Sequence, residues 1–361
     1  MPRREDPDRT KVALVDPWMG QLIAGRYRLE LRIAAGGFGA IYRALDLATD
    51  RDVALKLLHA SLAQDEGVAA RFRREGAALA RLRDPHTVAA YEVGETDDGT
   101  LFIAMELLGG DSLHTVFQEQ GPMSWRNVAA IARAVCSSLR EAHAQGIIHR
   151  DLKPANIHLE GEHRDFVKVL DFGIAKIVGG ALDNSDLTSA GQMIGTFDYM
   201  PPEQMVGGET TGKSDVYALG IVMYELLVGQ RPFGDLPTAA SMLAAMLSTI
   251  PRSPAQRRVS IPHELDRAIM RCLAQKPEDR PTVDELAHLL DVLIEEDEDR
   301  THVEPFRHVD HTTDRVPKQR QTPPPMMDEF PSGEQTVIDR GAYRSPPANT
   351  LPGIAPPKKP R

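Results

Sequence analysis

Three polar side chains in one short stretch have the types and spacing that phosphoryl transfer requires. Lys153 follows Asp151 by two residues, and Asn156 follows it by five. A carboxylate can orient a hydroxyl group, an ammonium group can neutralise a phosphate, and an amide oxygen can help to hold a metal ion. These side chains can do this chemistry only if other parts of the chain place them around a common point.

The composition is that of a globular, acidic protein. The chain has 361 residues, of which 42% are apolar, and this is enough for one large or two moderate cores. Its formal net charge of -10 argues against a nucleic-acid partner, because neutralising phosphates requires a basic surface. The two cysteines, Cys136 and Cys272, lie in apolar helical patterns, which favours a core role over a redox or metal role.

The sequence shows neither a secretion signal nor a membrane anchor. The N-terminus is charged and lacks the apolar stretch of a signal peptide. The longest apolar-rich segment, 218–228, is interrupted by Glu225 and is about half the length needed to cross a bilayer. We therefore expect no membrane span and a cytoplasmic location.

Alternating apolar residues and a glycine-rich turn predict a β-hairpin near the start of the chain. A strand is expected over 27–33, and a second strand over 40–44 follows the turn at 34–39. The residues expected on one face of the first strand are Tyr27, Leu29, Leu31 and Ile33. Glycines there would let backbone amides approach phosphates, although an ordinary turn is the simpler interpretation of this stretch taken alone.

Periodicity and capping residues predict the remaining elements. Lys56 ends a predicted strand, and Glu75 lies in a predicted helix over 68–82; taken alone, they could be a sheet-edge charge and one charge of a solvated helix face. A long amphipathic helix runs to Gln145, with Ser124 as its N-cap. Further strands are predicted over 53–56, 88–94, 100–107 and 166–170, and further helices over 238–247, 263–274 and 283–294.

These features occur in the order found in protein kinases. The stretch 148–159, Ile-His-Arg-Asp-Leu-Lys-Pro-Ala-Asn-Ile-His-Leu, resembles the catalytic loop of eukaryotic-type protein kinases, and Lys153 is typical of their Ser/Thr members. Further matches are Gly-Gly-Phe-Gly at 36–39, Val-Ala-Leu-Lys at 53–56, Arg-Phe-Arg-Arg-Glu at 71–75, Asp-Phe-Gly at 171–173, Gly-Thr-Phe-Asp-Tyr-Met-Pro-Pro-Glu at 195–203 and Asp-Arg-Pro at 279–281. Over residues 25–294, the chain resembles the bacterial, eukaryotic-like Ser/Thr protein kinases.

This resemblance implies an α+β protein kinase fold with two lobes. The N-lobe, about 25–107, would be a small antiparallel β-sheet with one main helix, and the C-lobe, about 108–294, would be larger and mostly α-helical. We expect a flexible lead at 1–24. The tail at 295–361, first acidic and then rich in proline, is expected to be disordered.

The resemblance also implies the catalytic residues and the cofactors, ATP and Mg²⁺, with Mn²⁺ as an alternative metal. Asp151 would accept or orient the proton of the substrate hydroxyl group, and Lys153 would stabilise the γ-phosphate. Asn156 and Asp171 would bind the metal ion, because Mg²⁺ prefers oxygen ligands.

A nucleotide pocket is implied between the lobes. Lys56 would bind the α- and β-phosphates, with Glu75 fixing its rotamer. The residues implied to line the pocket are Ile33, Gly36, Gly37, Gly39, Ile41, Ala54, Lys56, Met105, Glu106, Leu108 and His158. Ala34 and Pro201 depart from the family pattern, which has glycine and alanine there. His158 stands where an apolar residue usually lies beneath the adenine, so it would either stack on the base or act as a flat, neutral substitute.

Other residues are expected to support the site. His149 would pack against Phe172 rather than act as an acid or a base. Asp215 would support the backbone of the catalytic loop, and Glu203 would pair with Arg280.

The segment before Glu203 resembles a flexible activation loop. Arg150 would lack a partner beside the catalytic carboxylate unless a phosphate binds to it, so the resemblance predicts autophosphorylation. The predicted sites are Thr188 first, then Ser189 and Ser185. Thr196 would hydrogen-bond toward the catalytic residues and favour Ser/Thr substrates.

Partners are predicted from the domain and from the tail. Protein substrates with Ser or Thr are expected, and autophosphorylation between molecules would need at least a transient homodimer. Proline-rich pieces at 322–325 and 345–347 are either ligands of SH3- or WW-like modules or simply solvated chain. Thr336, in an acidic setting, resembles sites that forkhead-associated domains bind once they are phosphorylated.

The leading hypothesis is an active, ATP-dependent Ser/Thr protein kinase. The alternative is a pseudokinase scaffold that binds nucleotide and partners without efficient transfer, and its support is limited to the altered glycine turn, Pro201 and His158. Tyrosine kinase activity is disfavoured by Lys153 and Thr196.

Overall fold

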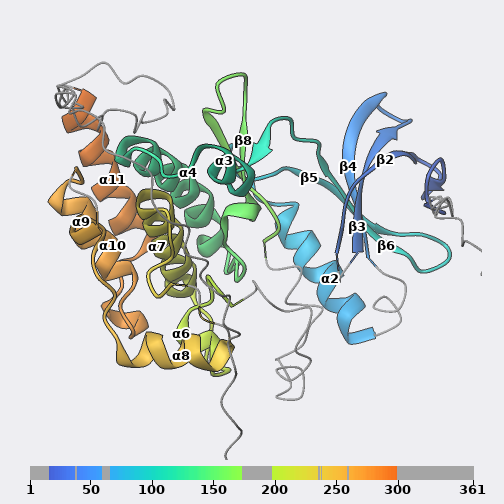
Figure 1. Ribbon diagram of the computed structural model, residues 1–361. Helices are drawn as coiled ribbons and strands as arrows, with labels where there is room; N and C mark the ends of the chain where they lie inside the picture. The colour runs from blue at the N-terminus through green and yellow to red at the C-terminus, as the bar shows by residue number, and fades with distance from the viewer. Residues whose placement is uncertain are drawn as a thin grey trace, which may run out of the picture. The chain divides into compact units, whose positions relative to one another are not determined.

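The computed structural model describes residues 16–36, 39–58, 66–172, 197–234, 236, 238–257 and 260–298. All of them lie in Met1–Asp310, the first of the two units into which the chain divides. Within this unit, a β-sheet lobe is followed in the sequence by a mostly helical lobe (Figure 1). This is the α+β architecture that the sequence predicts.

Six strands form the sheet of the first lobe in the order β1-β2-β3-β4-β6-β5, and neighbouring strands are antiparallel. Their bounds are β1 Leu22–Ile23, β2 Tyr27–Gly36, β3 Gly39–Asp46, β4 Arg51–Leu58, β5 Ala90–Glu95 and β6 Leu101–Glu106. Helix α2, Glu66–Leu79, packs against β5, and its Phe72 shares a buried cluster with Ala54 and Met105 of the sheet. This cluster connects the helix that carries Glu75 to the strands that line the predicted nucleotide pocket.

Strand β2 does not keep one apolar face, contrary to the prediction. Tyr27 and Leu29 are buried, but Leu31 is 57% exposed and Ile33 is 51% exposed. Register shifts in the β2–β3 ladder interrupt the regular pairing between Leu29 and Leu31 and again beyond Arg32. Such irregularities break the alternation of side chains between faces, so the outer half of this strand is not part of the core.

The domain begins before residue 25, which corrects the predicted boundary of the lead. β1 pairs with β2, and Trp18 packs against the cluster that contains Tyr27 and Leu29. The carboxylate of Asp16 accepts a hydrogen bond from the Tyr42 hydroxyl group at 3.0 Å.

Among its described residues, the second lobe contains helices and a small sheet. The helices are α3 Leu113–Gln120, α4 Trp125–Ala144, η1 Pro154–Asn156, α6 Pro202–Met205, α7 Gly212–Val228, α8 Ala239–Ser248, α9 Pro254–Arg257, α10 His263–Cys272, η3 Pro277–Asp279 and α11 Val283–Glu298. The sheet has the order β7 Asp111–Ser112, β8 Ile157–Glu160 and β9 Phe166–Val169. Ser124 caps α4 as predicted, because its Oγ accepts from Asn127 N at 3.1 Å. The end of α11 at Glu298 corrects the predicted start of the tail at 295.

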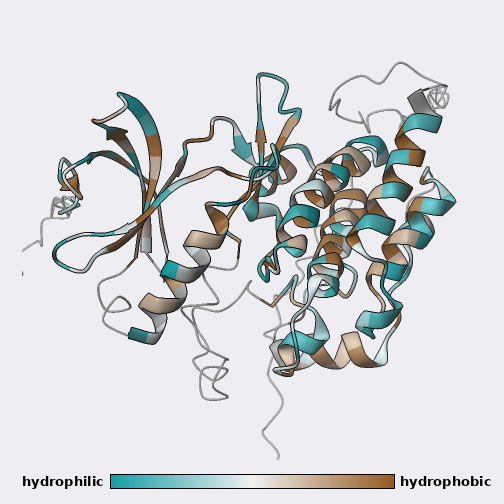
Figure 2. Ribbon diagram, turned by 180° about the vertical axis from the view of Figure 1, so that it is seen from behind, coloured by the Kyte–Doolittle hydropathy of each residue, from teal (hydrophilic) through white to brown (hydrophobic). Residues whose placement is uncertain are grey.

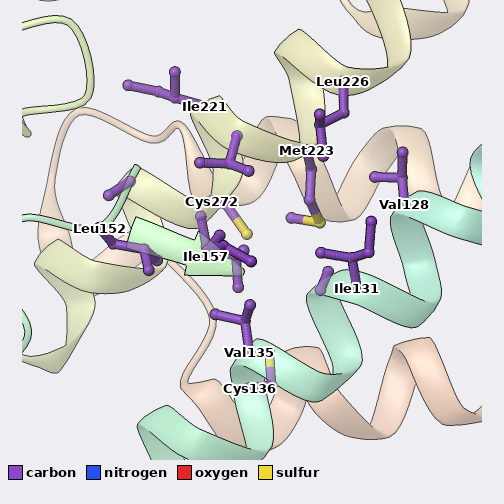
Figure 3. Packing of buried hydrophobic residues seen from close by; sticks show 14 of the residues in the cluster. Val128, Ile131, Val135, Cys136, Leu152, Ile157, Ile221, Met223, Leu226 and Cys272 are labelled. Carbon is purple, nitrogen blue, oxygen red and sulfur yellow. The ribbon is translucent and has the colours of Figure 1, made fainter. Parts of the chain in front are cut away.

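Helices α4 and α7 form the centre of the core of the second lobe. Figure 3 shows Val135 of α4 and Met223 of α7 directed into the same packed interior, together with Ile157 of β8 and Cys272 of α10. In Figure 2, the apolar colour appears on strands of the first lobe as well as on helices of the second. Burial raises the pKa of the Cys272 thiol to about 12 and raises that of Cys136 as well, which agrees with core roles for both.

Among the described residues, no helix is long and apolar enough to cross a membrane.

Candidate active site

The three polar residues of the catalytic loop meet around one carboxylate. Lys153 Nζ lies 2.8 Å from Asp151 Oδ2. The Asn156 amide donates to the Asp151 carbonyl oxygen at 2.8 Å and to its Oδ2 at 3.1 Å. Leu152 and Ile157, on either side, are buried in the core, so the loop has fixed attachment points. The sequence-predicted residues Asp151, Lys153 and Asn156 therefore form one constellation.

A buried aspartate of α7 supports the backbone of this loop, as predicted. Asp215 accepts hydrogen bonds from His149 N at 2.8 Å and from Arg150 N at 2.9 Å. Its Oδ2 also lies 2.8 Å from Nε2 of His143, at the end of α4. Arg150 has a positive φ of 63°, a conformation that is uncommon for residues with a Cβ. The Asp215 carboxylate holds the backbone in this turn just before Asp151.

His149 is a structural residue. It is fully buried, and its ring lies 4.7 Å from that of Phe172, as predicted. Its Nε2 lies 2.8 Å from the Leu170 carbonyl oxygen, and its Nδ1 accepts from Asp151 N at 3.3 Å. Burial lowers the pKa of His149 below its ordinary value despite the nearby carboxylates. A neutral ring with one donor and one acceptor satisfies both contacts.

Lys56 and Asp171 join the two lobes at the site. Lys56 Nζ, on β4, lies 2.6 Å from Asp171 Oδ1, just beyond β9. Burial alone would raise the pKa of Asp171, but the charge and hydrogen bond of Lys56, with the charge of Lys153, lower it below its ordinary value. Asp171 is therefore ionised at neutral pH. Glu75 lies within α2, but its side chain is outside the described part of the chain, so its pairing with Lys56 stays a prediction.

The oxygen atoms at this position fit a small, hard cation. Lys56 bonds to Oδ1 of Asp171 and thus leaves Oδ2 for a metal, while Asn156 uses its amide nitrogen toward Asp151 and leaves its oxygen. Mg²⁺ in proteins is typically held by one or two side-chain oxygens, with water and phosphate completing its octahedron. Asp171 Oδ2 and the Asn156 amide oxygen are a pair of side-chain oxygens of this kind.

The predicted pocket residues come from neighbouring strands. Ile41 is the ladder partner of Lys56, and Ala54 is the partner of Met105, so these side chains lie on adjacent strands. Gly39 begins β3, where a Cβ would lie 1.9 Å from the Leu57 carbonyl oxygen. Gly36 ends β2, Ile33 precedes it on the exposed half of that strand, and Leu108 follows β6. Gly37 lies outside the described residues.

The hinge segment, residues 106–109, connects the lobes, and two residues that bind it were missed in the sequence. Lys168 of β9 and Glu160 of β8 both bond to this segment. Lys168 could have been noticed as the one charged residue of the short apolar strand 166–170. His158 is one of the predicted pocket residues, and its Nε2 bonds to the Gly109 carbonyl oxygen at 2.5 Å.

The predicted Glu203–Arg280 pair is present and buried. Arg280, which is 1% exposed, donates from Nη1 and Nη2 to the two Glu203 carboxylate oxygens at 2.7 and 2.8 Å. Ser214 Oγ donates to the same carboxylate at 2.8 Å, and the guanidinium lies 4.6 Å from the Tyr217 ring centre. Burial would raise the pKa of Glu203, but the hydrogen bonds from Arg280 and Ser214 lower it. The pair connects helix α6, which follows the predicted activation loop, to the segment between η3 and α11.

A cavity of about 460 Å³ lies beside Lys153, between the catalytic loop, α3 and the end of α7. Both acidic groups in its wall have partners. Glu225 accepts a hydrogen bond from the Tyr199 hydroxyl group at 2.5 Å, and Asp198 forms an ion pair with Arg231. Burial raises the pKa of Glu225 above its ordinary value. The cavity is therefore an open space next to the catalytic loop whose acidic wall groups already have partners.

The predicted regulatory residues lie mostly outside the described residues. The predicted regulatory residues that lie outside are Thr188, Ser189, Ser185 and Thr196, together with Thr336 in the tail. Arg150 is one of the described residues, and it directly precedes Asp151 in the sequence.

Comparisons with known proteins show which family the chain resembles. Residues 27–289 match the protein kinase domain family. The chain is 42% identical over 270 residues to serine/threonine-protein kinase pkn3 of Myxococcus xanthus, covering 74% of this chain and 49% of that protein. It is 39% identical over 262 residues to serine/threonine-protein kinase PknB of Mycobacterium leprae, covering 72% and 41%. The chain thus spans about half or less of the length of these relatives.

A solved structure shares the fold. The crystal structure of the PknI kinase domain of Mycobacterium tuberculosis is 28% identical, with a TM-score of 0.58, and the match covers 76% of this chain and 98% of that one. With the catalytic loop, the Lys56–Asp171 pair and the Glu203–Arg280 pair in place, the chain belongs to the protein kinase domain family, among the bacterial, eukaryotic-like Ser/Thr kinases.

Proposed function

We propose that the protein is an ATP-dependent Ser/Thr protein kinase, which transfers the γ-phosphate of ATP to Ser or Thr side chains of proteins. The observation that carries this proposal is the convergence of Lys153 and Asn156 on the carboxylate of Asp151. The Lys56–Asp171 pair, which joins the two lobes at the site, supports it.

Asp151 is the group that would receive the substrate hydroxyl group. Its carboxylate orients the hydroxyl oxygen and accepts its proton as the new bond to phosphorus forms. Lys153, held 2.8 Å from this carboxylate, places a positive charge where the transferred phosphoryl group develops negative charge. Little covalent chemistry is required of the protein, so the rigid backbone support from Asp215 is part of the mechanism.

Asn156 and Asp171 would hold Mg²⁺, with Mn²⁺ as an alternative, and Lys56 would bind the α- and β-phosphates. ATP supplies the phosphoryl group and ADP as the leaving group when it is bound with its metal ion. The lowered pKa of Asp171 suits this role, because a metal ligand must be deprotonated.

Regulation and partners are proposed from the sequence. Phosphorylation of Thr188, or of Ser189, would place an anion that Arg150 could bind beside the active site. Thr196 would favour Ser/Thr substrates. A transient homodimer would allow transfer between molecules, and phosphorylated Thr336 would bind a forkhead-associated domain. We propose a cytoplasmic location, where ATP and protein substrates meet.

Incorporation of label tests the proposal. Wild-type protein incubated with γ-labelled ATP and Mg²⁺ should label itself and an added Ser/Thr protein substrate. Lys56→Met should bring labelling close to background, because the phosphates lose their cation. Equal labelling in both proteins would contradict the proposal, and nucleotide binding without transfer in wild type would favour the pseudokinase scaffold.

A further inference from the structure

The small sheet of the second lobe makes three polar contacts with the hinge segment. Lys168, His158 and Glu160 each bond to a residue within 106–109. We call these three side chains the hinge clasp. Its first contact is at the start of the hinge, where Lys168 Nζ lies 2.8 Å from Glu106 Oε2 and is itself largely buried. Glu106 is also held by Ala89, whose backbone N–H donates to the same oxygen at 3.2 Å.

The other two contacts hold both sides of one residue at the end of the hinge. His158 Nε2 lies 2.5 Å from the Gly109 carbonyl oxygen, so this ring nitrogen must carry the proton and donate it. The Gly109 N–H donates to Glu160 Oε1 at 2.9 Å. Both polar groups of Gly109 are therefore bonded to side chains of β8.

Sheet register explains why these side chains reach the hinge together. His158 is the ladder partner of Lys168 on β9 and of Ser112 on β7. Partners in an antiparallel ladder project from the same face of a sheet, and so do residues two apart on one strand. The clasp residues thus share one face, and Glu160 lies two residues beyond His158.

The chain after the hinge passes directly against this sheet. Gly110 has a positive φ of 73°, and a Cβ on it would lie 2.2 Å from the Leu159 carbonyl oxygen. A close approach of this kind requires glycine. The hinge is therefore fixed at Glu106 and at Gly109, and the chain directly after it is fixed by backbone contact at Gly110.

We propose that His158 is a positioning residue that acts through Gly109: together with Glu160 it holds the hinge backbone in the conformation that receives the adenine. This inference rests on the proposed nucleotide site and assigns the residues that preorganise it. Binding to a backbone that is already ordered avoids the entropy cost of ordering it. This role differs from that of a flat, neutral substitute beneath the base, because such a substitute would need no hydrogen bond to the hinge.

The two roles give opposite results when the imidazole is replaced. His158→Leu removes the donor to Gly109 but supplies apolar surface beneath the base. If His158 positions the hinge, the Kd for Mg-ATP should rise about two- to tenfold, the effect of one net hydrogen bond. His158→Gln keeps an N–H donor and should restore most of the affinity. Glu160→Ala should weaken binding in the same direction, because it removes the acceptor for Gly109 N–H.

Nucleotide affinity and hydrogen exchange together test this inference in the full chain. The Kd for Mg-ATP, the KM for ATP and kcat at saturating ATP are measured, with amide exchange followed in peptides covering 106–112. His158→Leu should raise Kd and KM, leave kcat near that of wild type and speed exchange in the hinge peptides. His163→Leu, the same substitution at an exposed position in the β8–β9 turn, serves as the matched control and should change none of these.

Two outcomes would overturn the role of His158. One is a His158→Leu protein that binds Mg-ATP as tightly as wild type or more tightly. The other is a His158→Gln protein with the same affinity and exchange as His158→Leu. Failure of the proposed function is distinguishable, because in that case the wild-type protein itself would transfer no phosphate.

Discussion

Lys56 Nζ lies 2.6 Å from Asp171 Oδ1, across 115 residues of sequence and between the two lobes. The contact holds the proposed phosphate-binding cation next to the proposed metal ligand. It also explains why the pKa of Asp171 is lowered although burial alone would raise it.

Lys56→Met should reduce kcat/KM by about 10²- to 10³-fold, the loss typical when one preorganised charge is removed from an active site. The thioether fills similar volume, so the fold should persist. Steady-state transfer to a Ser/Thr peptide measures the change, and circular dichroism verifies the fold. Arg51→Met, at the exposed start of the same strand, is the matched control. A kcat/KM within a factor of about two of wild type in Lys56→Met would rule out this role for the lysine.

Arg280→Ala should lower the free energy of unfolding by about 3–5 kcal/mol, because it leaves the Glu203 carboxylate largely buried without its cation. Denaturant titration followed by tryptophan fluorescence provides the measurement. Arg271→Ala, at an exposed position on neighbouring α10, should change the unfolding free energy little. Equal effects of the two substitutions would show that the buried pair does not stabilise the domain.

The Glu203–Arg280 pair should also make stability depend on pH in the acid range. The pKa of Glu203 in the folded protein is lowered from its ordinary value of 4.5, so the pair's contribution is present above that value and is lost as pH falls through the folded pKa. Between about pH 6 and pH 3, wild-type stability should fall more steeply than that of Glu203→Gln. Parallel stability curves for the two proteins would contradict a lowered pKa at this residue.

Gly39→Ala should destabilise the sheet, because its Cβ would lie 1.9 Å from the Leu57 carbonyl oxygen. Moving backbone to relieve such a clash costs about 1–3 kcal/mol. Gly36→Ala, at the other side of the same turn, meets no atom within 4 Å and is the paired control. Thermal melting should show a lower Tm for Gly39→Ala than for Gly36→Ala. The reverse order would mean that Gly39 does not lie close to the Leu57 carbonyl oxygen.

Contacts that depend on local spacing and on known motifs could be predicted from the sequence. Asp215, the Glu203–Arg280 pair and the packing of His149 on Phe172 were all expected and are present. Periodicity and the Ser124 cap also placed α4 correctly.

Contacts that depend on strand register could not be predicted in this way. Leu31 is exposed because the β2–β3 ladder shifts, and alternation alone does not reveal such a shift. The contacts of Lys168 and Glu160 with the hinge require the pairing of short strands that are far apart in sequence from residues 106–109. The four residues by which α11 exceeds its predicted end, 295–298, are acidic and lack the apolar periodicity that marks a helix.

Phosphoamino-acid analysis of wild type and Asp151→Asn tests the central claim most directly. Each protein is incubated with γ-labelled ATP, Mg²⁺ and a protein substrate, and the labelled product is hydrolysed. The account predicts phosphoserine or phosphothreonine in wild type and a rate about 10²- to 10⁴-fold lower for Asp151→Asn, which keeps the side-chain shape but loses the base. Equal rates in the two proteins, or label found on tyrosine alone, would contradict it.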